Sequence, residues 1–113
     1  MKTLDLSSFY GTENYYKHPL VQQFLYTDGV QYFATEAGAY WFLDIVATEY
    51  FPLLKTEGFL SIQLAVQSGA ATITVTDGND RNLKSRRIDF TDCPEGEYLF
   101  FLTDSVLMLS SEY

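Results

Sequence analysis

The period of the hydrophobic pattern changes near the middle of the chain. Between residues 30 and 45 the apolar residues recur at steps of three and four, at Val30, Phe33, Ala34, Ala37, Trp41 and Ile45. This spacing is typical of one face of an α-helix. From residue 58 onward the period becomes two, as Leu60, Ile62, Leu64 and Val66 alternate with smaller or polar residues. Such alternation indicates a β-strand with one buried face. The pattern therefore predicts helices first and strands second.

The helical segment carries a second apolar stripe that widens its buried face, formed by Phe42, Leu43, Val46 and Tyr50. Little polar surface remains, so we expect the helix to be largely buried, with Trp41, Phe33 and Phe42 in the core. Gly38 lies in its middle and costs about 1 kcal/mol relative to alanine. We expect Gly38 to divide the segment into two helices that meet at an angle, and Pro52 to end it.

Residues 24–33 allow two interpretations. Thr27-Asp28-Gly29 offers capping side chains for a helix that continues from Val30. Alternatively, Asp28-Gly29 is a hairpin turn between strands Phe24–Tyr26 and Val30–Phe33. The pattern favours the helix and leaves the hairpin open.

Strand signals fill the second half of the chain. They cover residues 60–66, 72–76, 84–91, 98–102 and 106–109, with turn residues between them. Nearer the N-terminus, residues 4–10 form a possible first helical turn, and Pro19 ends any helix before it. We predict an α+β fold of one domain, residues 1–113, with N-terminal helices packed on one face of a four- to five-stranded antiparallel β-meander.

Composition agrees with a folded, soluble domain. The chain has 113 residues, of which 47% are hydrophobic and 17% aromatic, whereas disordered chains are poor in aromatic residues. Its most apolar stretch, residues 37–46, is interrupted by Asp44 and is too short for a membrane span. Cys93 is the only cysteine, so no intramolecular disulfide can form. The first residues also lack the unbroken apolar stretch of a secretory signal. We therefore expect a cytoplasmic protein with no membrane partner.

The net charge of −8 is unevenly distributed. Arg81, Lys84, Arg86 and Arg87 form a basic cluster without an acidic residue, while acidic residues predominate on both sides of it. One interpretation is a solvated hairpin paired with neighbouring carboxylates. The other is a docking site for a carboxylate, a phosphate or an acidic partner surface. The overall charge argues against nucleic acid as a direct partner, because phosphate binding needs an excess of lysine and arginine.

Few residues suit catalysis or metal binding. His18 is the only histidine, and a single histidine with a single cysteine is too few for an ordinary zinc site. A Cys93–His18 catalytic pair would need a third, orienting group. The glycines match neither the dinucleotide-binding nor the P-loop motif. We therefore assign no catalytic residues, no metal and no cofactor.

Tyr15 and Tyr16 form an aromatic pair in a polar segment. Exposed tyrosines are enriched at protein interfaces, so this pair is a candidate for partner binding. Local packing is the alternative.

Several segments carry a resemblance to a known family. These are residues 26–30, 37–41, 11–13, 77–79, 88–92 and the terminal Ser111-Glu112-Tyr113. In them the chain resembles an uncharacterised family of small acidic bacterial proteins, a domain of unknown function that also occurs on phages and plasmids. The resemblance covers nearly the whole chain and implies no catalytic residues. It implies a setting on mobile elements, where small acidic proteins often bind host proteins.

These observations favour a non-catalytic, cytosolic protein–protein interaction module. Its partner would be another protein or a second copy of the chain in a homodimer, with edge strands and the tyrosine-rich segment supplying the surface. One alternative is an acidic nucleic-acid mimic that inhibits a host defence nuclease. Another is a small anionic-ligand binder, or an enzyme, that uses the Arg81–Arg87 cluster with His18 as acid or base.

Overall fold

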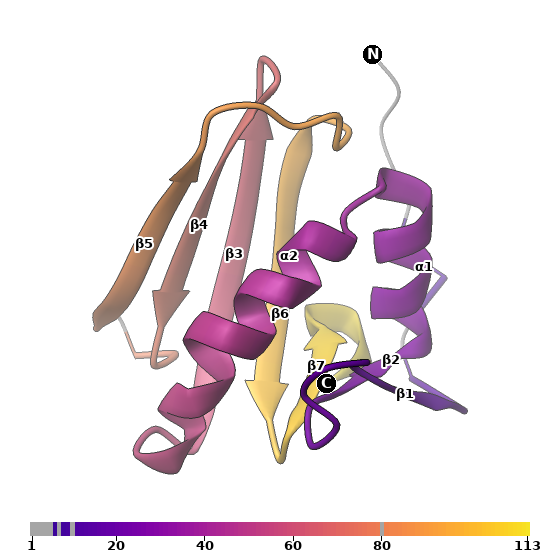
Figure 1. Ribbon diagram of the computed structural model, residues 1–113, viewed down its shortest axis with the longest axis vertical. Coiled ribbons are helices and arrows are strands. Elements are labelled where there is room, and N and C mark those ends of the chain that lie inside the picture. The colour runs from indigo at the N-terminus through magenta and orange to yellow at the C-terminus, as the bar shows by residue number, and fades with distance from the viewer. Residues whose placement is uncertain (1–5, 7, 10, 80) are drawn as a thin grey trace.

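Helices and one sheet make up the structure, which we describe from a computed structural model (Figure 1). The described residues are 6, 8–9, 11–79 and 81–113. Of the predicted turn at residues 4–10, positions 4, 5, 7 and 10 lie outside them. The elements follow in the order β1 (Tyr15–Lys17), β2 (Leu25–Thr27), α1 (Asp28–Ala37), α2 (Tyr40–Ile45), the π-helix η1 (Val46–Tyr50), the 3₁₀-helix η2 (Phe51–Lys55), β3 (Phe59–Gln67), β4 (Ala70–Thr76), β5 (Asn82–Ile88), β6 (Gly96–Thr103), β7 (Val106–Leu109) and the 3₁₀-helix η3 (Ser110–Glu112).

The α+β class is confirmed, but the predicted meander is wrong in strand number and in order. The sheet has seven strands in the order β1-β2-β7-β6-β3-β4-β5. Neighbouring strands are antiparallel except β2 and β7, which are parallel. The helices are also not N-terminal to all strands, because β1 and β2 precede them. These two strands have three residues each, which is too short for a period of two to be recognised.

Residues 25–37 resolve the choice between helix and hairpin in favour of the helix. Thr27 is the N-cap of α1, and its side chain accepts a hydrogen bond from the Val30 N–H. Gly29, proposed as a turn residue, lies in the first helical turn. There a Cβ atom would come within 2.6 Å of the Leu109 side chain. The hairpin is therefore wrong, although residues 25–27 do form a strand.

Gly38 divides the helical segment as expected. It caps α1 in the left-handed conformation (φ 62°), which glycine adopts without steric cost, and α2 begins two residues later. Pro52 does not end the helical path, which continues through η1 and η2 to Lys55. Proline is tolerated in the first turn of a helix, and here it starts the new turn of η2.

The core lies between the helices and one face of the sheet (Figure 1). The ring of Phe33 in α1 lies 5.2 Å from that of Phe100 in β6, and the ring of Phe42 in α2 lies 4.9 Å from Phe100, centroid to centroid. Burial of Phe33 and Phe42 confirms their predicted place, whereas Trp41 is only half-buried. The third predicted strand, residues 84–91, is displaced toward the N-terminus: β5 runs from Asn82 to Ile88, and Phe90 is 90% exposed.

The opposite face of the sheet carries neither α1 nor α2 (Figure 1). Burial alternates strictly along β3 and β4, with every second residue buried and the residues between them half-buried or exposed. A period of two means that the two sets point to opposite faces. We call the helix side of the sheet the covered face and the other side the uncovered face.

Candidate functional site

His18 is buried, and its two ring nitrogens are both engaged. Nδ1 accepts hydrogen bonds from the backbone N–H groups of Leu20 and Val21, at 3.2 and 3.1 Å. Nε2 therefore carries the proton and lies 2.8 Å from a carboxylate oxygen of Asp44. His18 thus links the turn after β1 to α2. Because both ring nitrogens are used in this link, neither is open to a substrate.

Cys93 is buried in the loop before β6, and its thiol is poorly suited to nucleophilic attack. Burial raises the pKa of Cys93 to about 11, so the thiol is neutral at pH 7. The neighbouring Tyr98 is also buried, which raises its pKa to about 12, and its hydroxyl donates to the Pro94 carbonyl at 2.6 Å. The hydrogen-bond partners of Cys93 and those of His18 have no residue in common.

The basic cluster does not converge on one spot. Arg81 lies 2.7 Å from Glu57 and 3.3 Å from Asp77, Arg86 is paired with Glu49, and Arg87 lies 3.5 Å from Asp89. Lys84 and Arg86 stand opposite Val75 and Ile73, on the covered side, while Arg87 stands opposite Thr72, on the other side. Arg81 thus lies just before the edge strand β5, and the other three residues are divided between its two sides.

Tyr15 and Tyr16 also point to opposite sides of the sheet. Tyr15 is 59% exposed. Tyr16 stacks on Tyr26 with 5.6 Å between ring centroids, and its hydroxyl donates to Asp28 at 3.1 Å. Tyr16 therefore packs against its neighbours, and only Tyr15 of this pair has a side chain exposed enough to contact a partner.

The carboxylates of Asp28 and Glu112 connect three segments that are far apart in the sequence at the start of α1. Asp28 accepts hydrogen bonds from the backbone N–H groups of Glu13 and Asn14, and the Glu13 bond contributes most to lowering the pKa of Asp28. Glu112 accepts from the Thr27 hydroxyl and from the N–H groups of Gly29 and Leu109. Negative charge at a helix N-terminus is favourable. The segments around residues 11–13, 26–30 and 111–113, which carry the family resemblance, therefore meet at one structural joint.

The uncovered face is poor in charge. Of the outward-facing residues in its four central strands, only Glu97 is charged; these residues are Phe59, Ser61, Gln63, Ala65 and Gln67 of β3, Ala70, Thr72, Thr74 and Thr76 of β4, Glu97, Leu99, Phe101 and Thr103 of β6, and Val106 and Met108 of β7. None of them is buried. Arg87 of the edge strand β5 points to the same side, so the charge-poor area is the part of the face formed by β3, β4, β6 and β7.

An aromatic cluster occupies one corner of this face. The rings of Phe59 and Phe101 lie 5.1 Å apart, and the C-terminal Tyr113 contacts both, with centroid distances of 5.6 and 5.3 Å. Tyr113 is nevertheless 72% exposed, and the nearby Leu99 is 41% exposed. Large apolar area thus remains in solvent beside the small polar residues of β3 and β4.

Next to this corner, part of β6 has a neighbour on one side only. The β6–β7 hairpin closes with the pair Thr103–Val106 around a two-residue turn. The turn residues have positive φ (52° and 68°), and in such a hairpin the closing residues exchange both backbone hydrogen bonds. Hydrogen-bonding direction alternates along a strand. The N–H and C=O groups of Phe101, Leu99 and Glu97 therefore point the same way, toward β7.

However, β7 reaches only as far as Phe100, which stands opposite Leu109. After Leu109 the chain turns into η3. Among the described residues no strand lies beside Glu97, whereas Ser110, which directly follows the extended Leu109, takes the place opposite Leu99; we call the segment Glu97–Tyr98 the β6 open edge. The sequence pattern predicted strands at residues 98–102 and 106–109 but did not show that β6 begins at Gly96 and so extends past the end of β7.

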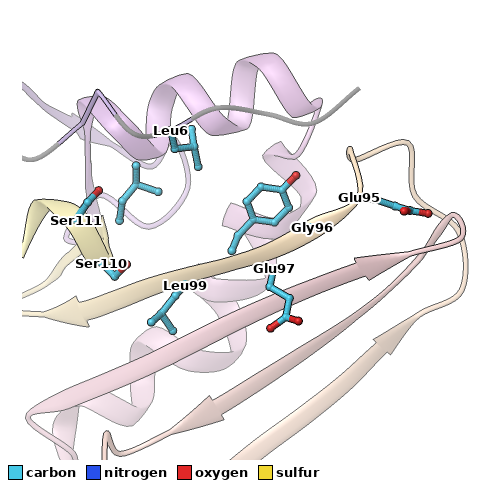
Figure 2. A pocket seen from close by; sticks show the side chains of 9 residues that line it. Leu6, Glu95, Gly96, Glu97, Leu99, Ser110 and Ser111 are labelled. Carbon is cyan, nitrogen blue, oxygen red and sulfur yellow. The ribbon is translucent and has the colours of Figure 1, made fainter. Parts of the chain in front are cut away.

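A pocket of about 290 Å³ adjoins the β6 open edge (Figure 2). Its lining includes Leu6, Tyr98, Leu109, Ser110 and Ser111. In Figure 2, Leu6 and Ser111 lie on one side of the β6 ribbon, whereas the side chains of Leu99 and Glu97 project to the other. The β6 open edge thus adjoins a hollow with apolar and hydroxyl-bearing walls.

The part of the chain that the structure describes holds no group of three or more His, Cys, Asp or Glu side chains arranged to bind a metal ion. Within the same residues, no helix has both the length and the hydropathy required to span a membrane.

Residues 2–113 match the model of a family of unknown function, DUF6876. The chain belongs to this family, and the resemblance to an uncharacterised domain is confirmed. The comparisons with curated proteins and with solved structures gave no significant match.

Proposed function

We propose that this member of a family of unknown function is a non-catalytic, cytosolic protein-binding module that recognises its partner through the uncovered face of the sheet. The observation that carries the proposal is the composition of that face. In the strands β3, β4, β6 and β7 it combines exposed apolar side chains with Ser, Thr and Gln and only one charged residue, Glu97, in a chain with fifteen acidic and seven basic residues.

An uncovered face alone would not support binding, because antiparallel sheets commonly have one face in water. Such faces are usually kept soluble by charged side chains, and depletion of charge together with enrichment of aromatic residues and Met is the compositional signature of an interface centre. The Phe59–Phe101–Tyr113 cluster and Met108 supply this signature. The only cysteine is buried and unpaired, which agrees with a reducing compartment.

The alternatives have less support. An anion site would need the basic cluster to converge, but Arg81, Arg86 and Arg87 are each paired with a carboxylate. A nucleic-acid mimic would need carboxylates facing solvent in a regular array, but Asp28 and Glu112 are used to fasten the start of α1.

Site-specific photo-crosslinking tests the proposal. A photoreactive phenylalanine analogue would replace Gln63 or Thr74 on the uncovered face, and Glu36 on the exposed side of α1 would serve as the control position. We expect both face positions to give the same discrete cross-linked protein in cells, and Glu36 to give none.

A second substitution shows whether the cross-link depends on the face. Thr74→Arg should abolish the product formed at position 63, whereas Glu36→Arg should leave it unchanged, with both variants folded by circular dichroism. Cross-linking from Glu36 but not from Gln63 or Thr74 would place the interface elsewhere and refute the proposal.

A further inference from the structure

We infer that the uncovered face binds a second copy of this chain, in a two-fold symmetric dimer in which Glu97 of each copy pairs with Arg87 of the other. The inference rests on the proposed protein-binding function and names the partner. Its basis is the place of these two opposite charges on the face. Glu97 lies on β6 and Arg87 on β5, the outer members of the four neighbouring strands β6-β3-β4-β5, and both side chains point to the uncovered side.

The strand register places both charges in one row across the sheet. Ala65 of β3 stands opposite Glu97 on one side and opposite Thr72 of β4 on the other, and Thr72 stands opposite Arg87. Three strand spacings, about 14 Å, therefore separate Glu97 from Arg87 along the row. This distance is too long for an ion pair within one chain. The midline between β3 and β4 divides the row into two equal halves.

A two-fold axis that runs above this midline, parallel to the strands, brings the opposite charges together. Sheets that pack face to face keep their strands roughly aligned and enclose a core about 10 Å thick. Around this axis, β6 of one copy lies over β5 of the other, and β3 lies over β4. Glu97 then faces the second copy's Arg87, and the same contact occurs again in reverse, because every contact in a two-fold interface is made twice.

Both charged groups are available for this contact. Among the described residues no cation lies within ion-pair distance of the Glu97 carboxylate. Arg87 lies 3.5 Å from Asp89, but both of these side chains are well exposed, and exposed ion pairs contribute little. A shallow hollow of about 290 Å³ adjoins Arg87, and the small residues Ala65 and Ala70 are part of its lining. This hollow leaves room for the incoming carboxylate.

Side-chain size is complementary about the same axis. The next row of the face runs from Leu99 of β6 through Gln63 and Thr74 to Ser85 of β5. The axis places Leu99, which is 41% exposed, over the small Ser85 of the second copy. It also places Gln63 over the second copy's Thr74. Apolar area that is exposed in one copy is thereby covered in the dimer.

Other arrangements of two copies are less favourable. An axis that crosses the strands along the row of Glu97 and Arg87 would place each of these residues over its own equivalent, and like charges in contact repel. Pairing of two β5 edges would bring Lys84, Arg86 and Arg87 against the same residues of the second copy. Charged side chains on an edge strand commonly prevent such pairing. A partner of different sequence is the alternative that the experiments below distinguish.

Charge reversal at the two ends of the row tests the dimer. Sedimentation equilibrium of the purified chain should show a dimer at high concentration. Arg87→Glu and Glu97→Arg should each weaken it about tenfold or more, because each creates two like-charge contacts. The double variant Arg87→Glu/Glu97→Arg restores opposite charges and should return the dissociation constant to within about threefold of the wild-type value.

Matched controls separate this contact from a general effect of charge. Arg87→Glu and Glu97→Arg change the net charge in opposite directions, so a change in net charge alone would not weaken the dimer in both. Lys84→Glu, on the covered side of β5, and Glu36→Arg, on α1, should each change the dissociation constant by less than about threefold. Circular dichroism should show the wild-type fold in every variant.

Cross-linking checks the register. In the Cys93→Ala background, chains with Glu97→Cys are mixed with chains with Arg87→Cys and treated with a short bismaleimide. The mixed dimer brings the two new thiols together and keeps one Glu97–Arg87 pair, so we expect a cross-linked dimer in the mixture. Each variant alone places its two thiols at opposite edges of the interface and should give little product.

Three results would overturn the inference: a single-chain mass at every soluble concentration, no recovery of the dimer in the double variant, or cross-linking of either cysteine variant alone as efficient as that of the mixture. A single-chain mass together with photo-cross-links from Gln63 and Thr74 to a different protein would refute the second copy alone and leave the proposed function standing. Absence of both the dimer and those cross-links would refute both.

Discussion

The two faces of the sheet are built from alternate residues of the same strands, yet they differ in almost every property. Toward the helices β3 presents Leu60, Ile62 and Leu64, all fully buried. Toward solvent the same strand presents Ser61, Gln63 and Ala65, all half-buried. The first set forms the core with α1 and α2, and the second set belongs to the charge-poor uncovered face.

This difference separates the residues that stabilise the fold from those available for binding. Burying a large apolar side chain contributes about 1.5–3 kcal/mol to stability. A small polar residue on a solvent-facing strand contributes little to stability, so its identity is left to other requirements. When two residues are adjacent in a strand and point to opposite faces, substitution of the one on the covered face should therefore lower stability much more. The predictions below test that difference.

The largest difference is expected between Phe100 and Phe101, which are adjacent in β6. Phe100 is fully buried and contacts Phe33 and Phe42, so Phe100→Ala should lower the free energy of unfolding by about 3–5 kcal/mol. Phe101 is half-buried beside Phe59 and Tyr113, and Phe101→Ala should cost about 1–2 kcal/mol.

Urea unfolding of both variants measures the two costs. Equal costs would mean that the uncovered face contributes to stability as much as the core does. That result would contradict the division of roles between the faces.

Glu112 tests the joint that fastens the C-terminal end of the chain to the covered side. Its carboxylate accepts three hydrogen bonds, two at the start of α1 from the buried Thr27 and from Gly29, and one from Leu109 at the end of β7. Glu112→Ala should lower the free energy of unfolding by about 2–3 kcal/mol, because donors that lose a charged partner remain desolvated. Glu36→Ala, in the exposed part of α1, should change it by less than about 0.5 kcal/mol.

Chemical denaturation of the two alanine variants separates the joint from a general loss of negative charge. If both variants lose the same stability, the hydrogen bonds of Glu112 contribute nothing beyond its charge. Gly29→Ala gives an independent check, since a Cβ at Gly29 would collide with the side chains of Leu109 and Glu112.

Cys93, buried on the covered side, gives a prediction in alkali. Its pKa is raised by burial from 9.0 to about 11, so the folded state holds the proton more tightly than the unfolded state. The resulting stabilisation is complete below pH 9 and is lost as pH rises toward 11. Between pH 8 and pH 10 the wild-type protein should therefore lose about 1 kcal/mol more than Cys93→Ala.

Urea denaturation of both proteins at the two pH values measures this difference. The thiol should also react slowly with a disulfide reagent at pH 8 in the native state and rapidly in urea. Fast native reaction would show that the loop before β6 opens readily and does not shield the covered face.

Features that depend on residues near one another in the sequence were predictable, whereas features that depend on distant residues were not. The five strands from β3 to β7 rest on alternation within single segments, and Thr27 and Gly38 act locally at the two ends of α1. The parallel pairing of β2 with β7 joins the two ends of the chain, and neither strand carries a local sign of its partner. The same holds for Glu112, whose partners Thr27 and Gly29 are more than eighty residues away.

The candidate site was less predictable than the fold. The sequence drew attention to the Arg81–Arg87 cluster and the Tyr15-Tyr16 pair because these residues are adjacent in the chain. Adjacent residues in a strand point to opposite sides, so both groups are divided between the two sides of the sheet. The uncovered face combines every second residue of four strands, and its lack of charge becomes visible only when the register is known.

The smallest difference in stability between substitutions on the two faces is expected for the adjacent residues Arg86 and Arg87. Arg86 reaches the covered side and pairs with Glu49 of η1, whereas Arg87 points to the uncovered side and lies 3.5 Å from Asp89. Both pairs are well exposed, and exposed ion pairs contribute about 0–1 kcal/mol. Arg86→Ala should therefore cost about 0.5 kcal/mol, because it releases the edge strand from η1, and Arg87→Ala should cost less.

Salt distinguishes an ion pair from packing as the cause of this small difference. Raising the sodium chloride concentration to about 1 M shortens the screening length to about 3 Å and should remove most of the difference between the two variants. A difference that persists in high salt would mean that the arginine's aliphatic stem packs on η1. In that case the covered side would extend to β5 through apolar contact, and the boundary between the two faces would lie beyond the edge strand.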